Sequence, residues 1–249
     1  GEVRGFYGKK HLANDGLHYE HRWFTPWPDG AVGEVDLFGR VLPVGDLVFE
    51  LGDGQRIGFE ICEDAWVPQR PAAGRAKDAI DIILNPSASH FAFGKFETRQ
   101  AIVKEASRAL QATYVYTNLL GNEAGRIIFD GGAIIASAGE LTALGQRFAL
   151  DDWQVCDVVV DINATRRKRA AMTSFKVDVV DDAACVHVEW QIKICQEATA
   201  QTEWQAHALE KEIRFTPAVT LGLIAYVRTS HSTGFVTSPS GAASCRPAL

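Results

Sequence analysis

The chain has few of the features that mark membrane, secreted or metal-stabilised proteins. Its apolar runs fall short of the roughly 18 residues that a bilayer-spanning helix requires, and its first residues show no signal-peptide pattern. Its five cysteines are odd in number, widely spaced and include no Cys-x-x-Cys pair, which argues against a disulfide scaffold and a zinc site. His11, His18 and His21 lie in one short segment, but no such cysteine pair accompanies them. We therefore expect a cytoplasmic protein with no bound metal ion and no membrane partner.

The chain also has no excess of positive charge. Its formal net charge is -6 and its isoelectric point is near 5.7, so its composition gives no support to nucleic-acid binding. The basic run Arg166–Arg169 is an exception, but such a run in an acidic chain is more often a solvated helix face or a subunit contact. We therefore expect no nucleic-acid partner.

The length of the chain limits how many domains it can form. With 249 residues, of which 47% are hydrophobic, it suits one large domain, or one domain and part of a second. It begins at Gly1, and Met172 is its only methionine. We therefore expect this sequence to be a piece of a longer protein.

Apolar runs separated by turn residues predict a protein rich in β-strands. Strands are expected at residues 1–10, 34–37, 46–51, 55–61, 81–86, 114–119, 127–130, 132–136 and 154–162. The Asp53-Gly54 pair between two of these runs favours a tight hairpin turn. Helical spacing of apolar residues predicts an amphipathic helix over 96–112, and a helix kinked at Pro217 within 202–230. Strands interleaved with helices indicate a layered α/β fold.

The segment Arg56–Pro68 carries the clearest chemical feature. Its apolar alternation ends at Cys62 and turns acidic at Glu63 and Asp64, which indicates a strand that ends in a sharp elbow. A thiol at such an elbow can face a pocket, and it becomes a strong nucleophile when a base and a cation lie nearby. The alternative is a buried structural cysteine, because free cysteine is among the most buried residue types.

Several short motifs follow one another along the chain. Tyr7–Leu12 carries two lysines after a short strand, and Gly58–Trp66 contains the form Cys-Glu-Asp-x-Trp. The further motifs are Leu84–Ser89, Phe93–Lys95, Tyr116–Gly121 and Phe129–Gly132. Together, over about residues 5–175, they resemble the nitrilase superfamily, and more closely its glutamine-hydrolysing branch that is fused to NAD synthetase. This resemblance implies an α-β-β-α sandwich of nitrilase type.

The resemblance also implies amide hydrolysis through a thioester. Cys62 would attack the side-chain amide of glutamine, and Lys9 and the backbone N–H of Glu63 would stabilise the developing negative charge. Glu20 would orient Lys9 or assist proton transfer. The released ammonia would serve the ATP-dependent conversion of deamido-NAD to NAD in a separate synthetase domain.

The glutamine pocket implied by the resemblance has Trp66 in its wall and Ser89 along its lining. Two residues depart from the family pattern there, since Asp15 and His18 stand where similar enzymes usually have aromatic residues. The general-base glutamate and the first strands of the superfamily normally lie upstream of the lysine motif, where this chain has no residues. We therefore expect a sandwich incomplete at its N-terminus, and a chain that is weakly active or inactive by itself.

The end of the chain resembles the entry into the synthetase domain, which has an ATP-pyrophosphatase-like α/β fold. The phosphate loop there normally reads Ser-Gly-Gly-x-Asp-Ser, whereas residues 240–245 keep only Ser240 and Gly241 of that pattern. We expect a glutaminase domain over 1–177, a partly helical linker over 178–212 and a truncated start of the synthetase domain over 213–249. The glutaminase domain would need no cofactor, and the missing synthetase domain would bind ATP, Mg and deamido-NAD. We also expect a homo-oligomer.

Two other functions stay open at this point. The chain could be a different amidase of the same superfamily that acts on another carbon–nitrogen bond, although the synthetase-like end speaks against this. It could also be a non-catalytic relic or an assembly subunit that uses the same surface for oligomer contacts. A screen of amide substrates distinguishes another amidase from a glutaminase. An electrophilic glutamine analogue that fails to label Cys62 would favour the non-catalytic alternative.

Overall fold

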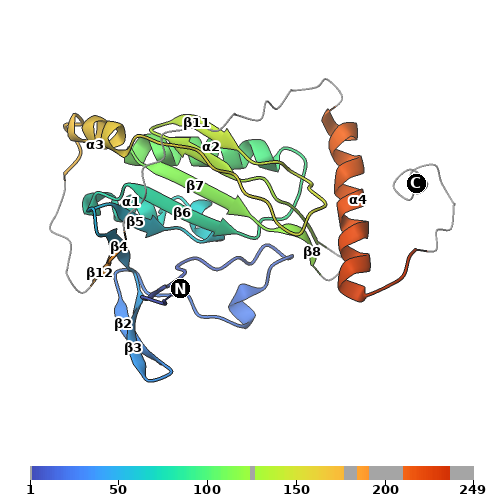
Figure 1. The fold of residues 1–249 in the computed structure, drawn as a ribbon, viewed down its shortest axis with the longest axis horizontal. Coiled ribbons are helices and arrows are strands. Elements are labelled where there is room, and N and C mark those ends of the chain that lie inside the picture. Colours follow the sequence, from blue (N-terminus) through green and yellow to red (C-terminus); the bar gives the residue numbers. More distant parts are fainter. Residues whose placement is uncertain (1, 124–126, 177–183, 191–209, 236–249) are drawn as a thin grey trace.

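Three β-sheets organise the part of the chain that the computed structural model describes, which is residues 2–123, 127–176, 184–190 and 210–235 (Figure 1). The largest sheet has seven strands in the order β11-β10-β7-β6-β5-β4-β12. In chain order these strands are β4 (Val48–Leu51), β5 (Arg56–Phe59), β6 (Ile82–Ser87), β7 (Thr113–Asn118), β10 (Ile134–Ser137), β11 (Glu140–Leu144) and β12 (Cys185–Val188). The sheet is mixed. β5, β6 and β7 run parallel to one another, and β12 pairs in parallel with β4, whereas the pairs β4–β5, β7–β10 and β10–β11 are antiparallel.

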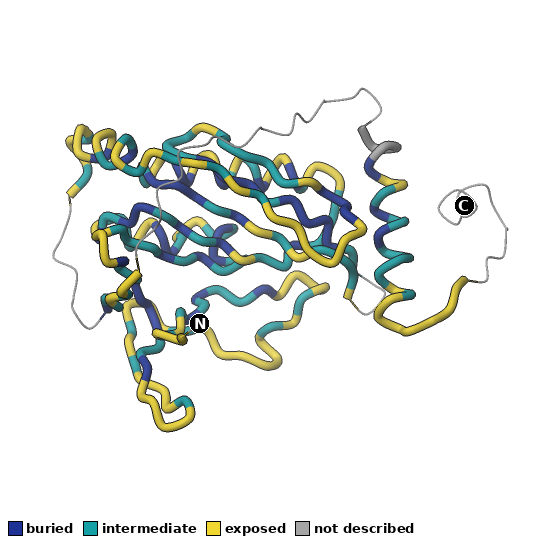
Figure 2. The backbone as a smooth tube through the Cα atoms, in the orientation of Figure 1, coloured by how far each residue is buried: buried dark blue, intermediate teal, exposed yellow. Residues whose placement is uncertain are grey.

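The helix α2 (Lys95–Leu110) covers one face of this sheet and packs against β7, β10 and β11 (Figure 1). Its buried residues recur at the helical period, and among them Phe96 and Val103 enter the main core. Ile83 of β6 and Ile134 of β10 meet them there, both almost fully buried. Figure 2 shows this core as the buried stretches of the central strands beneath the helix.

A smaller sheet has the order β1-β3-β2 and adjoins the loop that carries Lys9. Its strands are β1 (Phe6–Tyr7), β2 (Val32–Leu37) and β3 (Arg40–Gly45). β2 and β3 form a hairpin that projects from the body of the molecule (Figure 1). At its base the N–H of Gly8 donates to the carbonyl of Gly45 at 2.9 Å. Gly45 has φ +141°, and a Cβ there would lie 2.3 Å from the carbonyl oxygen of Ala31, so this crossing requires glycine.

The third sheet is a two-stranded antiparallel ribbon that supports the last helix. Its strands are β8 (Leu120–Glu123) and β9 (Ile127–Asp130). The helix α4 (Glu210–Ser230) packs against this ribbon at one end of the molecule (Figure 1), and Leu221 is buried there in a cluster with Phe148. Pro217 lies inside the helix, as predicted. Within the described ranges, no helix has both the length and the apolar character needed to cross a membrane.

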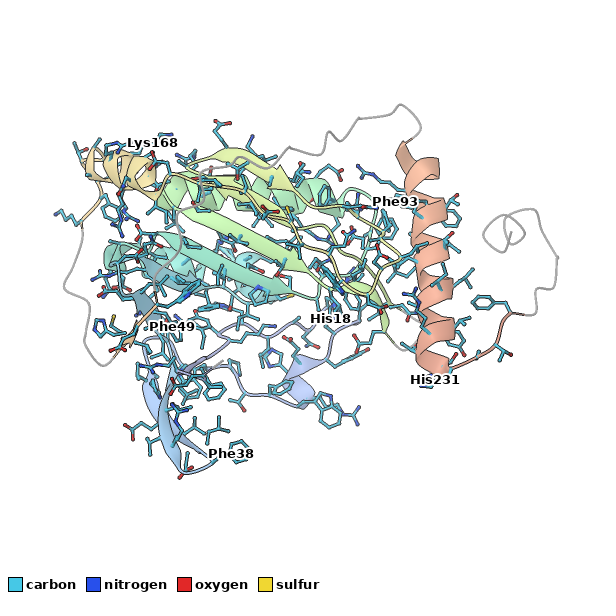
Figure 3. All side chains as sticks on the ribbon, in the orientation of Figure 1. His18, Phe38, Phe49, Phe93, Lys168 and His231 are labelled. Atoms are coloured by element: carbon cyan, nitrogen blue, oxygen red, sulfur yellow. The ribbon has the colours of Figure 1, made fainter. Side chains whose placement is uncertain are left out.

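The helix α3 (Ile162–Ala170) is attached to the large sheet by the basic run of the sequence. Arg166 and Arg169 both pair with the buried carboxylate of Asp81, Arg169 at 2.8 Å. The other two residues of the run are exposed, and Lys168 is labelled on the outer side of the helix in Figure 3. Arg166 and Arg169 therefore have a structural role, and only Arg167 and Lys168 form the solvated face that the sequence predicts.

Most of the predicted elements are confirmed. The helix predicted over 96–112 is α2, and the strands predicted at 81–86, 114–119 and 127–130 are β6, β7 and β9. The sequence pattern does not reveal β3, because Pro43 and Gly45 interrupt its apolar run. The range expected to be a linker contains β12, which pairs in parallel with β4.

The strand predicted at 154–162 is wrong. Residues 153–161 belong to no helix or strand, and α3 begins at Ile162. Trp153, Val155 and Val159 are exposed. No strand in the described part of the chain pairs with this segment through backbone hydrogen bonds, so it does not join a sheet. Together with β11 the segment lines a cavity of about 770 Å³.

The α/β fold class is confirmed by this architecture, and its nitrilase-type character by the structural comparison described below. The start of the ATP-pyrophosphatase-like domain is not shown. Ser240 and Gly241 lie outside the described residues, so the altered phosphate loop and the proposed domain boundaries stay predictions.

Candidate active site

Cys62 lies at a sharp turn directly after β5. The strand ends at Phe59, and Cys62 begins the short 3-10 helix η2 (Cys62–Ala65) with a φ of +48°. A positive φ is uncommon for a residue that carries a side chain, and it marks a turn that the surroundings must hold in place. Cys62 is only half-buried. The predicted elbow is therefore present, with a partly accessible thiol.

A buried carboxylate, that of Glu60, anchors the chain just before the elbow. Glu60 is fully buried and accepts hydrogen bonds from the Tyr114 hydroxyl at 2.6 Å and from the Ala72 N–H at 3.0 Å. Arg70 forms a salt bridge with the same carboxylate. Burial and the neighbouring Glu60 raise the pKa of Tyr114, so the phenol keeps the proton that it donates. This network fixes the chain two residues before the nucleophile.

Lys9 and Glu20, which the family resemblance places together in the site, form a close pair. Lys9 lies in the loop after β1, and its Nζ is 2.7 Å from Oε1 of Glu20. Glu20 begins the short helix η1 (Glu20–Arg22) and also accepts the N–H of Ala13 at 2.6 Å. The side chains of Lys9 and Glu20 are only 14% and 32% exposed, so water screens their attraction less than it would at the surface. The carboxylate therefore fixes both the ammonium group and the loop.

Asp64 connects the lysine loop to the elbow. Its carboxylate is fully buried and accepts the N–H of Ile61 at 2.9 Å and the N–H of His11 at 2.8 Å. The ring Nδ1 of His11 lies 3.1 Å from the same carboxylate. Because Ile61 belongs to the elbow and His11 to the lysine loop, Asp64 sets the position of one relative to the other. Sequence reasoning misses this role, although the Cys-Glu-Asp motif contains the residue.

Glu63 lies among the same charges. It is half-buried, and burial raises the pKa of its carboxyl group. The positive charge of Lys9 opposes this shift, whereas Asp15 and Glu20 add to it. A carboxyl group with a raised pKa holds its proton to higher pH than an ordinary glutamate, which favours a role in proton transfer. Glu63 thus brings a side chain to the site in addition to the backbone N–H that the resemblance implies.

A second lysine stands close to Cys62. Lys95 begins α2, and its Nζ lies 5.6 Å from the centre of the Trp66 ring. Burial lowers the pKa of Lys95, and the positive charge of Arg99 adds to the shift, while negative charge on Asp15 or Cys62 opposes it. Trp66, predicted in the pocket wall, therefore faces a cation that lies within electrostatic reach of the nucleophile. Lys95 ends the Phe93–Lys95 motif, but the sequence pattern alone assigns it no role.

Ser89 is buried in the loop between β6 and α2. Its N–H donates to Oδ1 of Asn118 at 2.8 Å, and its carbonyl accepts from Arg99 at 2.9 Å. Arg99 is fully buried and pairs with Asp130 at 2.8 Å. The backbone at Ser89 is therefore held rigidly by α2, β7 and β9.

These features define a mixed-sheet α/β protein with a cysteine elbow tied to a lysine–glutamate pair. The profile of the carbon-nitrogen hydrolase family matches residues 6–170, which is more than half of the sequence. The chain belongs to the carbon-nitrogen hydrolase family.

Curated relatives that match most of the chain are glutamine-dependent NAD(+) synthetases. The one from Mus musculus is 32% identical over 248 residues, covering 94% of this chain and 34% of the relative. The one from Saccharomyces cerevisiae is 32% identical over 271 residues, covering 100% of this chain and 37% of the relative. The chain thus spans about a third of the length of these relatives.

Solved structures agree with this assignment. A glutamine-dependent NAD(+) synthetase from Cytophaga hutchinsonii superposes with a TM-score of 0.67 at 35% identity, covering 94% of this chain and 30% of that one. A carbon-nitrogen hydrolase from Helicobacter pylori has a TM-score of 0.51 at 22% identity, covering 65% of this chain and 54% of that one, and so shares the fold. The nitrilase-type fold predicted from the motifs is therefore confirmed.

Proposed function

We propose that this chain carries the glutamine-hydrolysing site of a glutamine-dependent NAD(+) synthetase. The observation that carries the proposal is the elbow at Cys62, with its positive φ, joined through buried Asp64 to the loop that holds the Lys9–Glu20 pair. A nucleophile, a cation and two carboxyl groups are the parts that thioester-forming amide hydrolysis needs. The similarity to synthetases whose names specify glutamine supports the choice of substrate.

In the proposed mechanism Sγ of Cys62 forms a bond to the side-chain amide carbon of glutamine. The ammonium group of Lys9 and the N–H of Glu63 stabilise the oxyanion, and Glu20 holds Lys9 in place. The carbon–nitrogen bond then breaks, and the nitrogen takes up a proton and leaves as ammonia. Water attacks the thioester, frees Cys62 and yields glutamate. Glutamine and water are thus converted to glutamate and ammonia.

For the whole protein we propose the partners that the resemblance to NAD synthetases implies. Ammonia would pass to a synthetase domain that amidates deamido-NAD with ATP and Mg, and the assembly would be a homo-oligomer. Residues 240–245 of this chain lack the aspartate and the second glycine of an ATP loop, so they do not fit a Mg–ATP site and no step is assigned to them. The glutaminase site itself needs no cofactor in this scheme.

We further propose that the 249-residue chain turns over slowly by itself. Glu20 is committed to Lys9 and to the N–H of Ala13, so in this scheme Glu63 is the carboxyl group that exchanges protons with the reacting groups. One carboxyl group would then have to serve both the departing ammonia and the attacking water.

A trapping experiment tests the function separately from the rate. Hydroxylamine added with glutamine intercepts a thioester as the γ-glutamyl hydroxamate, which is measured alongside ammonia release. We expect slow formation of both products from glutamine, little from asparagine or simple aliphatic amides, and none in Cys62→Ala. A faster reaction with another amide would identify a different amidase, and no product from any amide by the folded chain would favour a non-catalytic relic. Rapid turnover abolished by Cys62→Ala would contradict the proposed slowness.

A further inference from the structure

Three side chains with metal-binding atoms meet beside the candidate active site. They are Asp15 and His18 of the N-terminal loop and His90 of the loop before α2, and one ligand atom from each lies within 4.8 Å of the others. Oδ2 of Asp15 is 3.9 Å from Nδ1 of His90, and the rings of His18 and His90 have centroids 5.7 Å apart. Figure 3 labels His18 where the N-terminal loop passes the ends of the central strands. In the described part of the chain this is the one such group of three.

Neighbouring groups hold each of these three residues in place. Oδ1 of Asp15 accepts the N–H groups of Leu17 at 3.0 Å and His18 at 2.9 Å, which leaves Oδ2 as the oxygen nearer to His90. The carbonyl of His90 accepts a hydrogen bond from buried Arg99 at 2.9 Å. The ring of His18 lies 6.5 Å from the ring of buried Phe129. His90 is therefore fixed by the backbone contact with Arg99, and Asp15 and His18 lie in a turn that the Asp15 carboxylate stabilises.

The donor set selects a class of metal ion. Two imidazole nitrogens and one carboxylate suit Zn²⁺, Co²⁺, Ni²⁺ or Cu²⁺, whereas Mg²⁺ and Ca²⁺ prefer oxygen ligands throughout. Bonds of about 2.0–2.2 Å require the three ligand atoms to close to about 3.3 Å, and the exposed Asp15 and half-buried His18 can move that far. We propose that Asp15, His18 and His90 form a binding site for a divalent transition-metal ion, next to Lys95 and the charged groups of the candidate active site.

Lys95 links this site to the nucleophile. Its Nζ lies 3.2 Å from Nδ1 and 3.1 Å from Nε2 of His90, so its ammonium group faces the ring nitrogens that would bind the metal. The ammonium group of Lys95 and a metal ion repel each other, so both cannot lie against the ring nitrogens of His90. A metal ion bound to His90 therefore requires the ammonium group of Lys95, which is also a positive charge near Cys62, to move away from the ring. The metal site does not rest on the proposed glutaminase activity.

The test is a titration of the full chain with Co²⁺, followed by visible absorption, in a Cys62→Ser background that removes the nearby thiolate. We expect one equivalent of Co²⁺ to bind with a spectrum of nitrogen and oxygen ligands, to be displaced by Zn²⁺, and to shift the ring NMR signals of His18 and His90. His18→Phe should weaken binding by at least about tenfold, since loss of even an outer-shell partner of a metal ligand typically costs about 10–100-fold in affinity. His21→Phe, a change to an exposed histidine of the same segment, should leave affinity unchanged.

A second variant guards against misfolding of His18→Phe. Asp15→Asn keeps an oxygen that can accept the two N–H groups of the turn but removes the charged ligand, and it should also weaken Co²⁺ binding. Circular dichroism of each variant verifies the fold. The proposal is overturned if no Co²⁺ binds, if thiolate charge-transfer bands appear, or if His21→Phe weakens binding as much as the two ligand variants do.

Discussion

The backbone of Cys62 is strained, and the neighbouring residues keep it so. A residue with a side chain at φ +48° lies in the left-handed region, which costs about 1–3 kcal/mol at such functional positions. The buried carboxylates of Glu60 and Asp64 hold the chain on either side of it. The strain positions the thiol at the end of β5, and the surrounding network stabilises that position.

At the residue scale, the first prediction concerns the charge of Glu20. Glu20→Gln keeps an acceptor for the N–H of Ala13 but loses the charge that holds Lys9 at 2.7 Å. A small misplacement of a catalytic group can cost about a hundredfold in rate. Hydroxamate formation from glutamine should therefore fall by about that factor. Glu34→Gln, at an exposed position on β2, is the control and should retain the wild-type rate; equal rates for both variants would contradict the role of Glu20.

The second prediction at this scale concerns Glu63 and pH. Burial raises the pKa of Glu63 above its ordinary value of 4.5, so the folded state binds its proton more tightly than the unfolded state does. Its favourable contribution is complete below pH 4.5 and is lost as pH rises through the folded pKa. Glu63→Gln cannot ionise, so its stability relative to wild type should increase over that rise.

Urea unfolding of both proteins at several pH values measures this difference. The exposed Glu105, whose pKa is lowered by its hydrogen bond to Arg108, supplies the control Glu105→Gln, which should not gain stability as pH rises. A difference between Glu63→Gln and wild type that stays constant with pH, or that shrinks as pH rises, would refute the shift.

Sequence motifs predict some site residues and not others. Cys62 ends an apolar run at an elbow, so the residue pattern itself indicates its chemistry, whereas the role of Lys9 is indicated only by the resemblance to a family motif. The sequence predicts no metal site, because His18 has no cysteine pair near it along the chain. His90 comes from the loop between β6 and α2, which is distant in sequence. The cluster forms only because the N-terminal loop packs against that loop.

At the scale of elements, periodicity succeeds where one face of a segment is buried. The helix α2 buries Phe96 and Val103 at helical spacing, so its pattern is clear. Residues 154–160 are as apolar as a strand, but a strand also needs a partner for its backbone, which no sequence pattern specifies. In the basic run of α3 the sequence predicts solvated charges, but two of the arginines pair with buried Asp81 and hold the helix on the sheet.

The attachment of α3 gives the prediction at this scale. Arg169 is nearly buried, pairs with Asp81 at 2.8 Å and donates to the carbonyl of Ile80. Arg169→Ala should lower the free energy of unfolding by about 3 kcal/mol, because it removes one partner of a buried ion pair. The matched variant Lys168→Ala, at the exposed neighbouring position, should change it by less than about 0.5 kcal/mol. Chemical denaturation measures both, and equal effects would show that Asp81 does not anchor the helix.

At the scale of the whole molecule, α4 joins the body that contains the site. The sequence assigns most of this helix to the start of a second domain, but its Leu221 packs with Phe148 against the β8–β9 ribbon. Arg214 of α4 also pairs with Glu97 of α2 at 2.6 Å. We therefore predict that α4 unfolds together with the sheet.

Leu221→Ala tests that prediction. Removing a buried leucine side chain should lower the free energy of unfolding by about 2–3 kcal/mol and leave a single transition. Tyr226→Ala on the same helix, where the tyrosine is 49% exposed, should have an effect below about 1 kcal/mol. A separate early transition for α4, or no effect of Leu221→Ala on the main one, would place the helix outside the cooperative unit.

The most direct test of the proposed glutaminase site is covalent labelling of Cys62. The chain is incubated with a glutamine analogue that carries an electrophilic ketone in place of the amide, and its mass is then measured intact and by peptide. We predict one adduct, located on Cys62, slowed by excess glutamine and absent in Cys62→Ala. No adduct on the folded chain, an adduct on Cys156 or Cys185 instead, or labelling that glutamine does not slow would contradict the proposed site.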